Sequence, residues 1–141
     1  MTTEEVKAWL QSYRFLKSDV ERLEEELVYW HSKSEKMTRA MSGMPSGSGD
    51  GDQVSSSVEK IMELESQLED KLSRMVEQRR KIEELIASLP ERQQQVLYAR
   101  YIDGLTWKQV SQKMYLEYRW VLRIHGRALR EISKLTIESH Y

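Results

Sequence analysis

An apolar side chain recurs at alternating steps of three and four residues along the first thirty residues of the chain. The pattern holds at Val6, Trp9, Tyr13, Leu16, Val20, Leu23, Leu27 and Trp30. This spacing draws one apolar stripe along a helix, and a stripe kept for about four heptads is typical of a coiled coil. Because Thr2 and Glu5 have the spacing of a capping box, we expect a first helix over about residues 3–41.

Residues 42–53 interrupt this helical pattern. They hold four of the six glycines and one of the two prolines, a composition typical of a flexible linker. Beyond them an apolar residue returns every seven positions, at Ile61, Leu68, Met75, Ile82 and Leu89. This repeat predicts a second helix over about residues 57–88. Its other apolar position is less regular, because Lys71 and Gln78 interrupt one register and Glu65 and Arg79 interrupt the other. We therefore expect an antiparallel coiled-coil hairpin over 1–88 and leave open a homo-oligomer formed through it.

Three shorter helical patterns follow in residues 89–141. Pro90 suits the start of a helix, and Gly104 suits its end. Thr106 and Gln109 repeat the capping-box spacing, which predicts a short helix to about Met114. A third helix is expected to begin near Glu117 or Tyr118 and to run to about Leu135. Its inward stripe would consist of Val121, Ile124 or His125, Ala128, Leu129 and Ile132.

The outward face of this last helix is basic. Steps of 4, 4 and 3 residues separate Arg119, Arg123, Arg127 and Arg130. Residues 89–141 hold 9 basic and 5 acidic side chains, whereas residues 1–88 hold 13 and 18. A short helix, a tight corner and a basic helix form a helix-turn-helix, which places its second helix in the major groove. The predicted fold is all-α, with a long coiled-coil hairpin and then a helix-turn-helix domain that binds double-stranded DNA.

Two segments carry a resemblance to a known family. Residues 89–97, LPERQQQVL, and 100–110, RYIDGLTWKQV, resemble region 4 of bacterial sigma factors. Residues 118–129 are more similar to sigma-like phage proteins of Gram-positive prophages, some of which form a family of unknown function, and to the related ArpU-type late regulators. Residues 1–10 and 42–45 also look typical of the phage family, so the resemblance covers nearly the whole chain.

The resemblance implies a sequence-specific, DNA-binding transcription regulator of a phage or prophage that acts on late genes in the cytoplasm of a bacterial host. Host RNA polymerase is a further partner to consider. The family pattern has glycine where Tyr115 stands, a small N-cap residue where Glu117 stands and a polar residue where Trp120 stands. The expected DNA-binding residues are Thr106, Lys108, Tyr118, Arg119, Trp120, Arg123, Arg127, Arg130 and Lys134.

Two other functions fit the same pattern. One is a DNA-packaging adaptor like a small terminase subunit, and the other is a coiled-coil interaction module whose helix-turn-helix has lost DNA binding. An enzyme is not expected, because the chain has no cysteine, no glycine-rich phosphate loop and only three scattered histidines. We therefore expect no catalytic, cofactor or metal site. With no apolar run of signal-peptide or membrane-helix length, we expect a soluble, cytoplasmic protein without a membrane partner.

Overall fold

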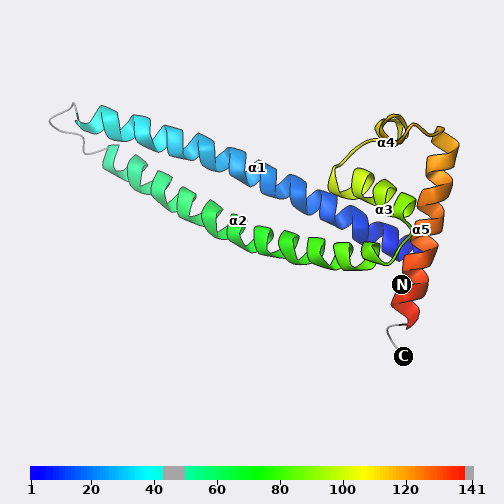
Figure 1. Ribbon diagram of the computed structural model, residues 1–141. Helices are drawn as coiled ribbons and strands as arrows, with labels where there is room; N and C mark the ends of the chain where they lie inside the picture. The colour runs from blue at the N-terminus through cyan, green and yellow to red at the C-terminus, as the bar shows by residue number, and fades with distance from the viewer. Residues whose placement is uncertain (43–49, 139–141) are drawn as a thin grey trace. The chain divides into compact units, whose positions relative to one another are not determined.

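The computed structural model describes residues 1–42 and 50–138. In this part of the chain the fold is all-α, as the sequence predicts, with five α-helices and one π-helical turn (Figure 1). The elements are α1 (Thr3–Ser42), α2 (Asp50–Ala87), α3 (Glu91–Leu97), the π-turn η1 (Tyr98–Ile102), α4 (Trp107–Met114) and α5 (Tyr118–Glu138). Among the described helices, none combines the length and the apolar character that crossing a bilayer requires.

The chain divides into two compact units. The first, which we call the composite unit, joins Met1–Leu16 to the chain from Met75 onward, and the second, the hairpin unit, is Lys17–Arg74. The sequence boundary expected at residue 88 falls inside the composite unit. The first turns of α1 and the last turns of α2 therefore belong with the carboxyl-terminal helices.

One apolar core explains this division. It combines buried side chains of α1, α2, α3, η1 and α5, which include Val6, Leu10, Tyr13, Ile82, Ile86, Leu97, Tyr101, Ala128, Leu129 and Ile132. Burying a single large apolar side chain stabilises a fold by about 1.5–3 kcal/mol, so a core of this size binds the segments firmly together. The chain start is also tied to α5, since the Met1 amino group donates to Thr136 Oγ1 (3.0 Å) and Ser133 Oγ donates to the Met1 carbonyl (2.6 Å).

The hairpin unit pairs α1 with α2 in antiparallel directions (Figure 1). Leu23 and Leu27 pack against Ile61 and Leu64 in its core. The predicted apolar stripe is thus confirmed in the hairpin unit. It differs at the start of α1, where Leu10 is fully buried, whereas Trp9, which the repeat predicts to be buried, is only partly buried. That stretch of α1 faces the carboxyl-terminal helices as well as α2, so it needs a wider apolar face than a coiled coil does.

The two polar residues that interrupt one register of α2, Lys71 and Gln78, have partners on α1. In the hairpin unit, Lys71 Nζ lies 3.1 Å from Asp19 Oδ2. In the composite unit, Gln78 Nε2 donates to the Trp9 carbonyl (2.9 Å) and to Ser12 Oγ (2.7 Å). Both positions therefore link the helices through polar contacts where the repeat would place an apolar side chain.

Helix α2 begins inside the segment that the sequence predicts to be a linker. Residues 43–49 lie outside the described residues, but residues 50–53 are helical and α2 begins seven residues before the predicted start at 57. Gly51 lowers helix stability by about 1 kcal/mol relative to alanine. Adding a turn to an existing helix is nevertheless easier than nucleating one, so a long helix can extend through a single glycine.

Candidate nucleic-acid interface

Helix α4 has a complete capping box. Thr106 Oγ1 accepts the Gln109 N–H (3.2 Å), and the Gln109 side chain accepts the Thr106 N–H (2.9 Å). Gly104, with φ of +72°, takes the left-handed conformation predicted for it. Helix α3, which precedes Gly104, is not a regular α-helix to its end, because the π-turn η1 replaces its last turn. On the inner side of α4, Val110 is fully buried.

A three-residue turn connects α4 to α5 (Figure 1). Tyr115 ends α4 with φ of +55° and is 95% exposed. The next residue, Leu116, donates its N–H to the Ser111 carbonyl (3.1 Å), and its own carbonyl accepts a hydrogen bond from Ser111 Oγ. Tyr115 thus adopts the left-handed conformation that glycine takes more easily, at a cost of about 1–2 kcal/mol.

Helix α5 separates an apolar face from a basic one. Val121, Ala128 and Ile132 are fully buried against the rest of the composite unit. The four predicted arginines are exposed on the opposite face, which we call the arginine row: Arg119, Arg123, Arg127 and Arg130. Within residues 1–42 and 50–138, none of them forms an ion pair. The row therefore presents unneutralised guanidinium groups that can bind an anionic partner.

The other predicted DNA-binding residues differ in their exposure and in their contacts. Lys108 on α4 is exposed, and Tyr118, the first residue of α5, is 50% exposed. Lys134 is exposed as well but lies 3.6 Å from Glu131 Oε1, so its charge is partly neutralised. Trp120 is 38% exposed, and the guanidinium carbon of Arg127 lies 5.7 Å from its ring centre. Part of the Trp120 ring is thus covered by an arginine of its own helix.

A buried polar pair fixes α5 against η1. The hydroxyl of Tyr101 and Nε2 of His125 share a hydrogen bond of 2.7 Å, and the Trp107 ring lies 4.5 Å from the imidazole centre. Burial lowers the pKa of His125 to about 4, helped by the nearby charges of Lys7 and Arg100. Burial also raises the pKa of Tyr101 to about 12. Both groups are therefore neutral near pH 7, and they hold α5 in place as packed residues.

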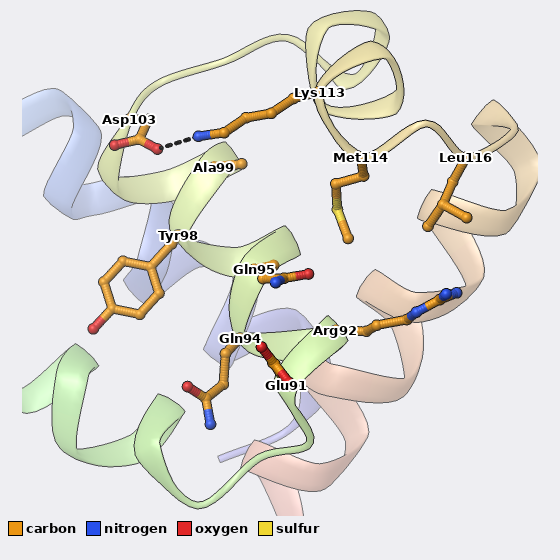
Figure 2. Close-up of a pocket in the computed structure, with 10 residues that line it drawn as sticks. All are labelled: Glu91, Arg92, Gln94, Gln95, Tyr98, Ala99, Asp103, Lys113, Met114 and Leu116. Carbon is orange, nitrogen blue, oxygen red and sulfur yellow. Dashed lines mark hydrogen bonds and ion pairs between the residues drawn. The ribbon is translucent and has the colours of Figure 1, made fainter.

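A pocket of about 570 Å³ opens between α3 and the end of α4. Figure 2 shows Met114 and Leu116 entering it from α4 and the turn, toward Gln95 of α3. At its edge Lys113 Nζ lies 3.4 Å from Asp103 Oδ2. Its lining includes none of the predicted DNA-binding residues, so the pocket and the arginine row are separate features.

Two basic residues of α1 have surroundings that the sequence does not predict. Lys7 and Arg14 lie in the composite unit, where their charges act on His125 and Arg100 respectively. Their spacing of seven residues places them on one helix face. Nothing in the sequence indicates that Lys7 acts on His125, 118 residues further along the chain, or Arg14 on Arg100, 86 residues further. Only the shared core of the composite unit brings them there.

Comparison with models of known protein families gives a match. The model of a family described as "Protein of unknown function (DUF722)" matches residues 7–134. No curated protein and no solved structure matches the chain. Among the described residues, no group of three or more histidines and carboxylates could hold a metal ion.

Proposed function

We propose that this chain, which belongs to the family described as protein of unknown function (DUF722), binds double-stranded DNA through α5. In this proposal it is a sequence-specific transcription regulator of a phage or prophage. It acts on late genes in the cytoplasm of the bacterial host, where RNA polymerase is a candidate second partner. The observation that carries the proposal is the exposed arginine row, which forms no ion pair within the described residues, on a helix that follows a short helix and a tight turn.

The dimensions of α5 fit this role. An α-helix with its side chains is about 10–12 Å across, and the major groove of B-DNA is about 12 Å wide. Arginine can donate two hydrogen bonds to the O6 and N7 atoms of guanine, and it also binds phosphates. In the proposal, Arg119 and Arg123, near the start of α5, approach base edges, while Arg127 and Arg130 contact phosphates.

The net charge of the composite unit also supports DNA as the partner. Residues 1–16 and 75–141 hold 14 basic and 10 acidic side chains, a net charge of +4, whereas residues 17–74 hold 8 and 13, a net charge of −5. A polyanion is therefore attracted to the composite unit and repelled by the hairpin unit. The likeness of residues 89–110 to region 4 of sigma factors, and of residues 118–129 to ArpU-type regulators, adds support for transcription control.

Selection of a duplex from a random library, followed by fluorescence anisotropy, tests the proposal with the full chain. We expect Arg123→Ala to weaken binding to the selected duplex by about 1–3 kcal/mol and to relax the preference at one base pair. The matched control is Arg74→Ala, which removes an exposed arginine of the hairpin unit that pairs with Asp70 and should leave binding unchanged. If the wild-type chain binds no duplex even at low salt, the proposal is wrong.

A further inference from the structure

A glycine, Gly126, interrupts the side chains along the middle of α5. Glycine is the poorest helix former after proline, so a glycine inside a helix weakens it. A Cβ atom added at Gly126 would lie 3.6 Å from Arg130 Nη1, which is an ordinary contact. Apart from its two chain neighbours and the backbone of α5, no other described atom lies within 4 Å of that Cβ. Packing among the described residues therefore does not require a glycine at this position.

A hollow lies on the basic face of α5 at this glycine. It has a volume of about 480 Å³, and we call it the Gly126 notch. Its lining consists of Leu122, Arg123, Gly126, Arg127 and Arg130. Three of the four members of the arginine row therefore border one concave site on a single helix.

The arginines around the notch are accessible to an anion. All three are exposed, and in the described part of the chain none of them forms an ion pair. The guanidinium carbon of Arg127 lies 5.7 Å from the centre of the Trp120 ring, so this side chain has lost part of its freedom before it binds. Guanidinium groups donate pairs of hydrogen bonds to phosphate oxygens. The notch thus combines a floor without a side chain and a rim of cationic donors.

The shape of the notch favours a phosphate that belongs to a DNA backbone. A helix in the major groove lies between the two phosphate backbones of the duplex. A side chain that faces one of these backbones holds the helix away from it, whereas glycine allows a close approach. Leu122, which is 37% exposed, adds an apolar wall to the notch. The carbon atoms of a deoxyribose can cover such a wall, and a free phosphate ion cannot.

We propose that the Gly126 notch holds a backbone phosphate of the duplex that α5 reads. Arg127 and Arg130 donate hydrogen bonds to this phosphate, and Gly126 is the positioning residue that lets it reach the helix. Arg123 borders the notch on the side of the helix start and keeps the contact with base edges proposed for it. This inference rests on the proposed function, and it adds an uncharged residue that sets how closely α5 approaches the DNA backbone.

The variant Gly126→Ala separates this role from folding. Because the added Cβ fits the free protein and alanine is the best helix former, we expect a higher urea midpoint than that of wild type. The same variant should bind DNA more weakly, with the slope of log Kobs against log salt reduced by about one unit for the lost phosphate. Affinities for selected and random duplexes should fall by the same factor, because a phosphate contact carries no base information. The longer side chain of Gly126→Gln should weaken binding further.

Two more variants of the full-length protein serve as controls. Gly51→Ala replaces another helical glycine, in the hairpin unit, and should keep the wild-type affinity and salt slope. The double variant Gly126→Ala/Arg130→Ala should lose less affinity than the two single variants combined, because both changes act on one phosphate.

Three results would overturn the inference. Wild-type affinity and slope in both Gly126→Ala and Gly126→Gln would mean that no phosphate enters the notch. If Arg123→Ala still weakens binding in that case, the proposed function stands and only the role of Gly126 fails. A changed specificity ratio would mean that a base, rather than a phosphate, lies against Gly126. Stabilisation of wild type by inorganic phosphate at constant ionic strength, absent in Gly126→Gln and combined with an unchanged DNA slope, would assign the notch to a free phosphate.

Discussion

At the scale of single residues, buried His125 makes the stability of the composite unit depend on pH. Its imidazole is neutral because burial opposes the charged form, and the cations Lys7 and Arg100 oppose it further. The hydrogen bond to Tyr101 gives the neutral ring a buried partner. Protonation would place a third positive charge among two others, away from water. The folded state therefore resists protonation much more than the unfolded chain does.

We predict that the free energy of unfolding falls as the pH is lowered from about 6.5 to 4. The pKa of His125 is about 4 in the folded protein and 6.5 in its ordinary state, so between these values the unfolded chain binds the proton first. The contribution is fully present above pH 6.5 and reaches a loss on the order of 2–3 kcal/mol near pH 4. Urea denaturation at several pH values measures it.

The control for this prediction is a comparison of two histidine variants. His125→Gln cannot titrate in this range, so its stability should change less between pH 7 and 5 than that of wild type. His31→Gln, at an exposed histidine 3.7 Å from Glu65, should keep the wild-type dependence. Equal pH profiles for wild type and His125→Gln would contradict the prediction.

Helical spacing in the sequence predicts which residues of a helix are buried. The period of α5 alone predicts its inward stripe, and Val121, Ile124, Ala128, Leu129 and Ile132 are all buried. The sequence does not predict contacts that depend on a distant segment. The partner of His125 is Tyr101, and one of the charges beside it, that of Lys7, comes from α1, so no local pattern encodes this arrangement.

At the scale of elements, the turn between α4 and α5 carries a local cost that a substitution can remove. Tyr115 has φ of +55°, and its side chain is 95% exposed, so it contributes little packing to offset the unfavourable conformation. We predict that Tyr115→Gly raises the free energy of unfolding by about 0.5–1 kcal/mol, the conformational gain of 1–2 kcal/mol less the greater entropy of glycine in the unfolded chain. A higher urea midpoint at an unchanged m-value would show it.

Tyr115→Ala separates the backbone from the side chain. It removes the exposed ring but keeps a Cβ in the left-handed region, so its stability should stay within about 0.5 kcal/mol of wild type. If alanine and glycine stabilise the protein equally, the ring rather than the backbone is responsible. Helical spacing places this turn between a helix that ends near Met114 and one that begins near residue 118, although Tyr115 and Glu117 stand where the resembled family has a glycine and a small N-cap residue. The sequence does not predict η1, because no residue pattern distinguishes a single π-turn from the end of an α-helix.

At the scale of the whole molecule, the composite unit is assembled from the two ends of the chain. The sequence predicts each helix from its spacing, but it places the boundary between domains at residue 88, where the charge changes from net acidic to net basic. The structure groups the segments by their shared core instead. Apolar spacing specifies which face of a helix is buried, whereas the partner of that face depends on tertiary packing that a single sequence does not display.

This grouping predicts a smaller protein that still folds. Gln78 of α2 bonds directly to Ser12 and Trp9 of α1, so the two helices are adjacent near the end of the composite unit. A six-residue Gly/Ser linker has an r.m.s. reach of about 13 Å, enough for the 8–10 Å between packed helices. We therefore expect residues 1–16, joined by this linker to 75–141, to give a helical protein that unfolds cooperatively and keeps the DNA affinity of the full chain.

The matched fragment 89–141 should behave differently, because it lacks Val6, Leu10, Tyr13, Ile82 and Ile86 of the core. In this fragment their partners in α5 would be exposed to water, and each buried side chain that is lost removes about 1.5–3 kcal/mol of stability. The sum of these losses is comparable to the total stability of a small domain. We expect this fragment to show weak helicity and no sharp thermal transition by circular dichroism. A cooperative transition in 89–141 near that of the linked protein would contradict the composite core, and it would make the carboxyl-terminal helices a domain in their own right.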